Sequence, residues 1–540
     1  MRYVYVYILH YFRMLGKAYP IKKAFCAFYG TNINKRNKGG LTMKRFIALL
    51  LVISMLAAAL AACGTPPDDK DPADTTAADQ GPDDNGIDED GKYTTGFSDE
   101  FLRQWSGTTF DVRTVDLHEA RMQIDFVEQS DDPVDNAVYK RTDYLEGVMG
   151  IDLVDNIVPD YYSNGFVPMD TLIESGDSTY YLANVRCIES IVTWTNGNLY
   201  MFDQLRYVDL SKGYWAQDLN PELTLAGYQY VAVGAADLNV YDLIFSLLFS
   251  KSLFQRKNNL REINLYDLVK EGKWTVDKME EVMAGAYFDA NSNDVMDEDD
   301  EYGYLADNRM VIPQFLDSCE ALSVIKDEKD YPQLNFQSDK FYDVMTRVFE
   351  IMWDQNNWFT NFKRDNDIPS QCIKMFMNNQ SLFLDCSFRY IPSLRNMESE
   401  FGIVPYPKWS EQQEDYHSRV AYFFSLIIPN TCKDPDLAGV VLEVLNCYSA
   451  NEVIPVYKDV ALSSKIARDE ESGEMIDIIF THRTIDLGDA TFCDLIRDGL
   501  LANMFGSDNR NISTLTKQER NLNKTIENYI KRATEAYGSR

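Results

Sequence analysis

The sequence predicts an α/β protein with at least two domains, on two observations. Met122–Val127 has the pattern of a strand, Val134–Val148 repeats apolar residues at helical spacing, and Gly150–Val154 is a second apolar strand. A strand, a helix and a strand in this order indicate a βαβ unit and a parallel sheet. About 480 residues follow the N-terminal segments described next, enough for two or more domains.

A secretory signal peptide precedes this unit. Met43 is followed by two basic residues, Phe46–Leu60 is almost wholly apolar, and small residues come next. Leu-Ala-Ala-Cys63 resembles a bacterial lipobox, in which the Cys63 thiol is diacylated and becomes the first mature residue. The alternative is a plain signal peptide or an anchor helix that ends in Cys. We predict residues 43–62 as the signal peptide and residues 1–42 as a mis-annotated extension.

Charge limits the partners of the mature chain. The whole sequence has a net charge of −32, and residues 1–62 hold 10 basic residues and no acid, so the rest carries −42. This argues against nucleic acid and against direct docking on anionic lipid heads. Residues 63–99 are predicted to be a disordered acidic tether, because Thr65–Gly91 has almost no large apolar side chain.

Cysteine use gives no sign of a disulfide framework. Nine Cys are present, of which Cys26 lies in the extension and Cys63 in the lipobox. The other seven form no CxxC pair, and an odd number leaves at least one thiol unpaired. We therefore expect mostly buried free thiols at Cys187, Cys319, Cys372, Cys386, Cys432, Cys447 and Cys493.

Several short segments in a fixed order carry a family resemblance. They are Asp135–Arg141 with Leu145-Glu146, Arg206–Trp215, Gly402–Lys408 and Ala467–Met475. Together they resemble the extracellular solute-binding proteins of family 1, the carbohydrate-type receptors of bacterial ABC importers, over roughly residues 108–535.

The resemblance implies a two-lobed α/β fold of the periplasmic-binding-protein type (type II), with a ligand cleft between the lobes. Lobe 1 would comprise residues 100–233 and 421–465, and lobe 2 residues 234–420 and 466–540. Tyr230–Val233 and Tyr422–Ile428 would be the crossing strands, since both are apolar.

The same resemblance implies a function. The chain would be a monomer, lipid-anchored on the outside of a cell membrane, most simply in a Gram-positive envelope. It would close on a carbohydrate, favouring an oligosaccharide, and deliver it to the importer's permease subunits. The alternatives are a secreted glycan-active hydrolase and a surface glycan-binding lipoprotein without a transport role.

One acidic loop predicts a structural calcium ion. Residues 289–300 place oxygen ligands at EF-hand-like positions, and similar loops occur in this receptor family. Position 6 is Asp294 where Gly is usual, and position 12 is Asp300, shorter than the usual Glu. The alternative is a solvated acidic loop. The predicted ligands are Asp289, Asn291, Asn293, the Val295 carbonyl, Asp297 and Asp300.

A sugar site needs aromatic faces for C–H patches and charged or amide side chains for hydroxyls. Ser381–Asp385 is predicted as a strand that leads into a cleft loop with Asp385, Arg389 and Tyr390. Arg389 pairing with a nearby acid is an equally good alternative. Tyr181–Arg186 would be the equivalent loop of lobe 1. The predicted ligand residues are Trp215, Trp358, Asp385, Arg389, Tyr390, Asn184 and Arg186.

Catalytic motifs are missing from the sequence. There is no GxSxG, P-loop or GxGxxG, and the mature His residues, His118, His417 and His482, have no metal-ligand spacing. A carboxylate pair of the glycosidase type is not excluded by counting, because acids are abundant. We predict a binding protein rather than an enzyme.

Overall fold

The computed structural model describes residues 86–117, 120, 124, 132–307, 309–352, 368–463, 470–502, 504 and 512–538. All of them belong to one compact unit, Asp79–Arg540. The predictions for residues 1–42, residues 43–62, Cys63 and Trp358 lie outside the described residues.

The first sheet, which defines lobe 1, has the strand order β11-β3-β1-β2. β1 runs parallel to both β2 and β3, whereas β11 is antiparallel to β3. The helix α6 (Pro133–Met149) connects β1 and β2, so the predicted βαβ unit is confirmed. Its first strand is β1, earlier in the chain than the predicted strand Met122–Val127, most of which lies outside the described residues. The strands are β1 (Thr109–Val115), β2 (Asp152–Val158), β3 (Leu182–Arg186) and β11 (Phe424–Ile427).

The second sheet, which defines lobe 2, has the order β5-β8-β4-β9. β5 and β8 are parallel, and β4 is antiparallel to both of its neighbours. Seven of the residues in β4 and β9 are among the least exposed in the protein, as expected for strands covered on both faces. The strands are β4 (Phe245–Ser250), β5 (Tyr302–Leu305), β8 (Ser381–Ser387) and β9 (Phe401–Val404).

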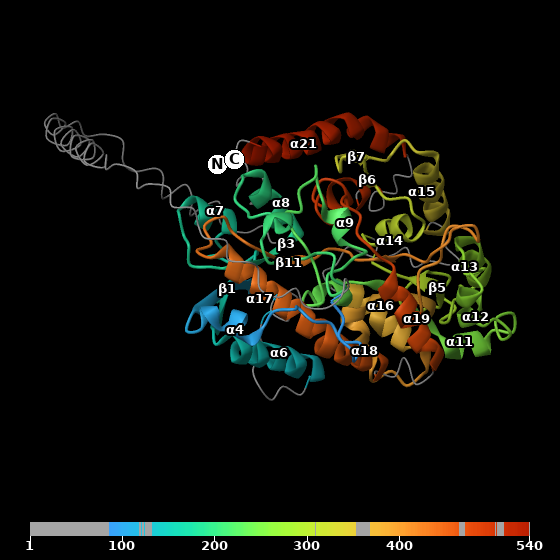
Figure 1. Ribbon diagram of the computed structural model, residues 1–540. Coiled ribbons are helices and arrows are strands. Elements are labelled where there is room, and N and C mark those ends of the chain that lie inside the picture. The colour runs from blue at the N-terminus through green and yellow to red at the C-terminus, as the bar shows by residue number, and fades with distance from the viewer. Residues whose placement is uncertain are drawn as a thin grey trace, which may run out of the picture. The chain divides into compact units, whose positions relative to one another are not determined.

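Helices cover both sheets (Figure 1). Around lobe 1 lie α4 (Asp99–Leu102), α6, α7 (Met169–Glu174), α8 (Cys187–Thr195) and α17 (Pro435–Tyr448). Around lobe 2 lie α11 (Lys251–Arg256), α12 (Leu265–Lys270), α13 (Val276–Met283), α14 (Val311–Ser318), α15 (Asp339–Met352), α16 (Ile368–Met377) and α19 (Glu470–Thr481). Short helices in the connections are α9 (Asn220–Leu223), α10 (Asn239–Asp242) and the 3₁₀ helices η1 (Arg103–Trp105), η2 (Phe202–Gln204) and η3 (Phe388–Leu394).

The sequence also indicates Thr275 as the N-cap of a helix over Thr275–Ala286, with Trp274 before it as a core residue, and both predictions are confirmed. Thr275 caps α13, because its hydroxyl accepts a hydrogen bond from the Lys278 amide. Trp274, directly before this cap, is fully buried and donates its indole N–H to the Pro405 carbonyl at 2.9 Å. Trp274 is therefore a core residue, as expected.

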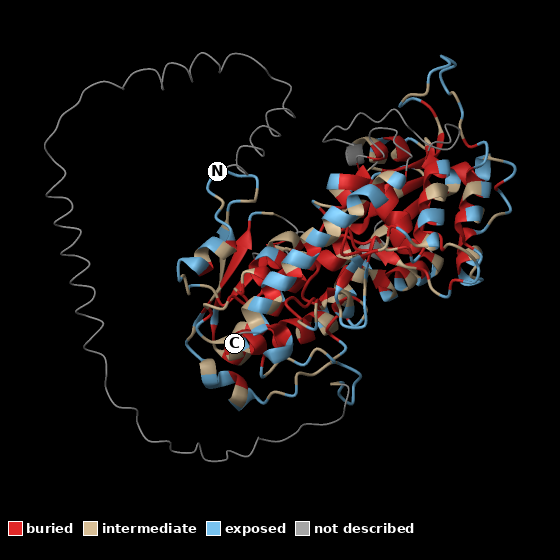
Figure 2. Cartoon of the chain, turned by 90° about the horizontal axis from the view of Figure 1, so that it is seen from above, coloured by how far each residue is buried: buried red, intermediate tan, exposed pale blue. Residues whose placement is uncertain are grey.

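One described helix is long and apolar enough to cross a membrane. It is the run Pro435–Val460, in which a π-helical turn, η4 (Ser449–Val453), joins α17 to α18 (Ile454–Ser463). Of its most apolar window, 72% is buried inside the unit. Figure 2 shows the extent of this buried interior. The burial is that of a core helix.

The chain crosses between the lobes along two segments that lie side by side. Ile244 and Val420 form a β-bridge, and the Ala421 amide donates to the Leu243 carbonyl at 3.2 Å. A two-stranded ribbon, β10 (Ser418–Arg419) with β12 (Arg483–Thr484), adjoins this crossing. The last helix, α21 (Ser513–Gly538), contacts α8 of lobe 1 and also the hairpin of β6 (Val324–Lys326) and β7 (Pro332–Leu334).

The predicted disordered tether, residues 63–99, overlaps the described structure from Gly86 onward. From Gly86 the chain turns back on itself through an Ile87–Tyr93 bridge and packs on lobe 1. The Tyr93 ring lies edge-on to Tyr214, with ring centres 5.9 Å apart, and Phe97 contacts Tyr207. The prediction of disorder is therefore wrong for residues 86–99, because these two aromatic rings supply the apolar anchors that the preceding residues lack.

The seven mature cysteines are free and buried in the structure. This confirms the expectation from their odd number and spacing.

Candidate functional site

A cavity of about 410 Å³ lies between the two lobes. In lobe 1 its lining residues follow the carboxyl ends of the three parallel strands: Leu117 after β1, Tyr162 after β2 and Arg186 at the end of β3. In lobe 2, Asp307 follows β5 and Asp385 lies near the end of β8. Ligand sites of open α/β sheets form at such carboxyl ends, and this volume is within the roughly 300–1,000 Å³ that small-molecule sites occupy.

The lobe 1 wall carries one cation stacked on two aromatic rings. The Arg186 guanidinium carbon lies 3.9 Å from the centre of the Tyr161 ring and 5.7 Å from that of Tyr162. Arg186 also donates to the Tyr162 hydroxyl at 3.3 Å. The Tyr162 side chain is 79% exposed, so most of its ring remains open to a ligand. This wall thus offers a fixed guanidinium and an aromatic face.

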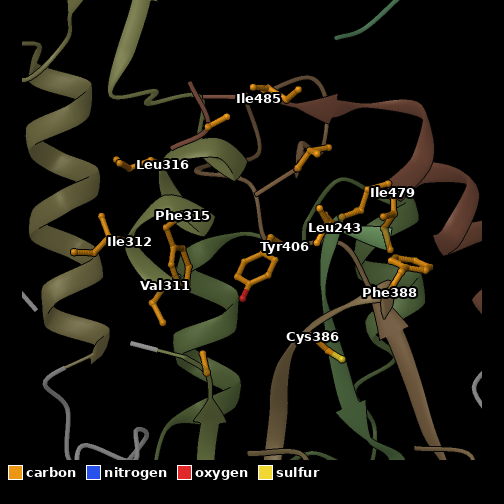
Figure 3. Close-up of a cluster of buried hydrophobic side chains, with 14 of the residues drawn as sticks. Leu243, Val311, Ile312, Phe315, Leu316, Cys386, Phe388, Tyr406, Ile479 and Ile485 are labelled. Carbon is orange, nitrogen blue, oxygen red and sulfur yellow. The ribbon is translucent and has the colours of Figure 1, made fainter. Parts of the chain in front are cut away.

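The lobe 2 wall presents a carboxyl group, Asp385, at the end of a chain of buried hydroxyls. Tyr304 and Tyr406 share a hydrogen bond of 2.8 Å, and Tyr406 donates to Asp385 Oδ1 at 2.5 Å. Gln314 donates to the same oxygen at 3.1 Å. Figure 3 shows the Tyr406 ring among apolar side chains that include Phe315 and Val311. This apolar packing holds the hydroxyl in position.

Burial raises the pKa of Asp385 to about 7, against the lowering effect of the Tyr406 hydroxyl. The carboxyl group therefore changes charge near neutral pH. None of the described residues donates a hydrogen bond to its Oδ2, so Asp385 offers an acceptor, or a donor when protonated, to a molecule in the cavity.

Other charged residues of the cavity are paired with each other. Arg309 contacts Asp307 at 3.0 Å. Arg497 donates two hydrogen bonds to Asp498, at 3.1 and 2.9 Å. Behind it, the buried Asp489 accepts two hydrogen bonds from Arg419, at 2.7 and 2.8 Å. These pairs fix the floor of the cavity and compensate each other's charge.

Four predicted ligand residues meet at this cavity. Arg186 comes from lobe 1, and Asp385, Arg389 and Tyr390 come from β8 and the helix η3 of lobe 2. The Arg389 guanidinium carbon lies 5.6 Å from the centre of the Tyr390 ring. Their placement agrees with the sequence analysis, and their role in binding stays a prediction.

Two predicted ligand residues are in the core instead. Trp215 is 2% exposed, and its indole N–H donates to Glu443 at 2.8 Å, which leaves no ring face for a sugar. Asn184 is fully buried in the middle of β3, where its amide donates to the Ala120 carbonyl at 2.8 Å. The predictions for Trp215 and Asn184 are therefore wrong. Tyr181–Arg186 is also mainly a strand rather than a loop.

Sequence reasoning missed Tyr162, the pair Asp307–Arg309 and the pair Arg497–Asp498. Tyr162 and Asp307 had a usable signal, since both follow a strand and parallel strands end at one edge. Arg497 had none, because it belongs to a π-helical turn, η6 (Arg497–Leu501), far from any strand in the sequence.

The predicted calcium loop has part of the expected geometry. Asp294 adopts the left-handed conformation, with φ of 58°, at the position where Gly is usual. Asp289 accepts from the amides of Asn293 and Asp294 at 3.2 and 2.9 Å. Asp300 is fully buried and accepts from the Tyr287 hydroxyl and the Ala290 amide. The oxygen ligands suit a hard cation. The residue types and the backbone conformation of the loop therefore both fit calcium.

A different group of possible metal ligands occurs at the cavity. Among the His, Cys, Asp and Glu residues that the structure describes, only Cys493, Asp494 and Asp498 bring three ligand atoms within 4.8 Å of one another. Asp498 already binds Arg497 through both oxygens, and burial raises the pKa of the Cys493 thiol. Both facts argue against a metal at this position.

No protein-family model and no curated protein sequence matches this chain. Among solved structures, UspC from M. tuberculosis matches with a TM-score of 0.50 and 13% identity, over 76% of this chain and 98% of that chain. A cyclo/maltodextrin-binding protein complexed with maltotetraose has a TM-score of 0.49, with 14% identity over 79% and 96%. The sugar-binding protein MalE from Xanthomonas citri has a TM-score of 0.47, with 13% identity over 80% and 98%.

Identities this low establish the fold alone. The described unit has the two-lobed α/β fold of periplasmic-binding-protein-like chains, with a mixed sheet in each lobe. The fold that the sequence resemblance implied is therefore confirmed.

Proposed function

We propose that this chain is a receptor that captures a carbohydrate between its lobes and delivers it to the permease subunits of an ABC importer. The observation that carries the proposal is the composition of the inter-lobe cavity. It combines an open aromatic face at Tyr162, a guanidinium at Arg186 and a carboxyl group at Asp385. Saccharides need such an apolar face beside hydroxyl-binding polar groups.

Lobe closure is the proposed mechanism. Arg186 and Tyr162 belong to lobe 1, and Asp385 to lobe 2, so a ligand that touches all three bridges the lobes. Such a ligand favours the closed state by the difference between its affinities for the two states. The paired crossing segments at Ile244 and Val420 are the natural hinge.

The proposed location is the outer face of a cell membrane, most simply in a Gram-positive envelope. The support is the lipobox-like sequence ending at Cys63 and the acidic, apolar-poor residues that follow it. A lipid anchor there would keep a captured solute near its importer. Palmitate labelling of the wild-type chain but not of Cys63→Ser tests this, and equal labelling of both would contradict it.

We also propose that residues 289–300 hold a calcium ion as a structural brace of lobe 2. The support is the EF-hand-like ligand spacing together with the left-handed Asp294. Isothermal titration should detect Ca²⁺ binding below the millimolar range in the wild type and lose it in Asp300→Asn. Binding only at millimolar Ca²⁺ would contradict the proposal.

A glycan-active hydrolase is the second candidate, and one observation favours it. Asp385 has the raised pKa of a general acid, and Asp494 is a second carboxylate at the same cavity. Prolonged incubation with oligosaccharides separates the two functions. A receptor gains thermal stability without product, whereas a hydrolase releases shorter saccharides.

The decisive experiment is a thermal-shift screen of the unit 79–540 against neutral and acidic mono- and oligosaccharides. A ligand at 100 times its Kd should stabilise the fold by about 2.7 kcal/mol. Small-angle scattering with the best ligand should then show compaction. A screen without any stabilising saccharide would contradict a carbohydrate receptor, and a stabilising ligand without compaction would contradict lobe closure.

A further inference from the structure

We propose that the ligand is an acidic saccharide whose anionic group, a carboxylate or a phosphate ester, binds Arg186. The inference rests on the proposed function and names the substrate class of the same cavity. The cavity's arginines differ in how their charges are neutralised.

Arg186 differs in its partners from two other arginines of the cavity, Arg309 and Arg497. Arg309 is neutralised by Asp307, and Arg497 by Asp498 together with Asp489. Among the described residues, Arg186 has only tyrosine partners, Tyr161 and Tyr162. None of the described carboxylates lies within 4.0 Å of its guanidinium. A half-buried guanidinium without an acid therefore leaves one positive charge on the lobe 1 wall.

The Arg186 side chain is also built to receive a planar anion. The Tyr161 ring, 3.9 Å from the guanidinium carbon, fixes the plane of the group from one side. Its Nε is buried and makes no hydrogen bond within the described protein. A guanidinium binds carboxylate or phosphate oxygens through charge-assisted hydrogen bonds, whereas neutral hydroxyls need no full charge.

The start of α8 adds positive potential at the same place. Arg186 is the residue that precedes this nine-residue helix, and no side chain caps its first turn. Cys187 and Ile188 of that turn line the cavity. The Cys187 amide donates to the Phe423 carbonyl at 3.0 Å and Glu189 adds a negative charge to the same turn, so the helix dipole alone favours an anion there. On the opposite wall, Asp385 provides the contact for sugar hydroxyls.

Two acids of the cavity lie outside these pairs, Asp385 on the lobe 2 wall and Asp494. Asp494 is exposed on the C-terminal segment and makes no ion pair with Arg186. Solvent screens an exposed carboxylate far more than a half-buried guanidinium, so Asp494 does not cancel the charge at Arg186. The expected ligand orientation therefore has the anionic group at lobe 1 and neutral hydroxyls at lobe 2.

Isothermal titration with matched saccharides tests the proposal. The probes are oligogalacturonides of two to four residues, galactose oligomers of equal length, and galactose phosphates. We expect at least one acidic set to bind wild-type protein at least tenfold more tightly than the neutral set. The uronate and phosphate arms then identify which anion is preferred.

Two variants test whether Arg186 causes the preference for acidic saccharides. Arg186→Gln should lose the preference for acidic over neutral saccharides, measured as the ratio of the two affinities. Arg206→Gln is the matched control, because Arg206 also stacks on a tyrosine, Tyr207, at 5.0 Å, but outside the cavity. It should retain the full preference. An acidic preference that survives in Arg186→Gln would overturn the assignment.

Wild-type measurements keep the test valid if Arg186→Gln does not fold. Raising the salt concentration from 50 to 500 mM should weaken acidic binding several-fold and leave neutral binding unchanged. Neutral binding without an acidic preference overturns this inference but supports the proposed function. Absence of binding by every saccharide overturns both.

Discussion

Two buried carboxyl groups, one in each lobe, have similar tyrosine partners and different surroundings. Glu443 of lobe 1 is fully buried and accepts from the Tyr214 hydroxyl, the Trp215 indole and the Asp209 amide. Asp385 of lobe 2 accepts from Tyr406 and Gln314 through one oxygen and directs the other to the cavity. Burial raises the pKa of both.

The difference separates a structural group from a functional one. A buried carboxylate whose oxygens all have protein partners stabilises the fold only as long as every partner remains. A carboxyl group left half-satisfied at a cavity wall costs stability and is available to a ligand. We therefore expect changes at Glu443 to affect folding and changes at Asp385 to affect binding.

The largest expected effect is at Glu443. Glu443→Ala leaves two buried donors, on Tyr214 and Trp215, and the Asp209 amide without an acceptor and should lower the free energy of unfolding by about 3–5 kcal/mol. Urea unfolding followed by tryptophan fluorescence measures it. Glu452→Ala is the control, because Glu452 lies on the same helical run as Glu443. The side chains of its ion pair are exposed, Glu452 by 46% and Lys92 by 57%, so its loss should lower the free energy of unfolding by less than about 1 kcal/mol. A loss below about 1 kcal/mol in Glu443→Ala would remove the contrast.

Asp385→Asn should weaken binding of the saccharide selected in the screen by about 10–100-fold, because it removes a charged hydrogen-bond acceptor. The fold should remain intact, as the amide keeps the shape of the side chain. Isothermal titration measures the affinity. Asp277→Asn, on an exposed surface pair with Arg347, is the matched control. Equal affinities for wild type and Asp385→Asn would show that this wall does not touch the ligand.

The pH dependence of stability sharpens the role of Asp385. Its folded pKa of about 7 is above the ordinary value of 3.8, so the folded state holds the proton more tightly. The resulting stabilisation is complete below about pH 4 and is lost as pH rises through about 7. Relative to wild type, Asp385→Asn should thus gain about 1–2 kcal/mol between pH 5 and pH 8.

Urea midpoints of both proteins at the two pH values provide the measurement. Asp237 and Asp486, whose pKa values burial also raises, to about 7 and about 6, contribute equally to both proteins and cancel. A difference between wild type and variant that stays constant with pH would contradict the raised pKa.

The smallest expected effect on stability is at Tyr162. Its exposed ring packs little, so Tyr162→Ala should change the free energy of unfolding by less than about 0.5 kcal/mol. Loss of a stacking face should nevertheless weaken saccharide binding about 3–10-fold. Tyr342→Ala, at an exposed tyrosine on α15 away from the cavity, should change neither quantity. Unchanged binding in Tyr162→Ala would place the ligand elsewhere in the cavity.

The sequence alone determined those features that depend on neighbours along the chain. Helical spacing located α6, a capping threonine located α13, and the strand before Asp385 placed that residue, Arg389 and Tyr390 at a strand end. The two-lobed fold was implied by the family resemblance of several short segments in a fixed order. The helix, its cap and the strand end depend on local geometry, which a few adjacent residues specify.

Only the tertiary structure decided which side chains reach the cavity. Asn184 and Arg186 lie two residues apart on the same face of β3, yet Asn184 is covered by another segment while Arg186 lies at the strand's open end. Trp215 is in the core because of Glu443, 228 residues later. Arg497 reaches the cavity through packing of the C-terminal segment. Burial and pairing depend on partners that are distant in the sequence, and the spacing of residues along the chain does not identify those partners.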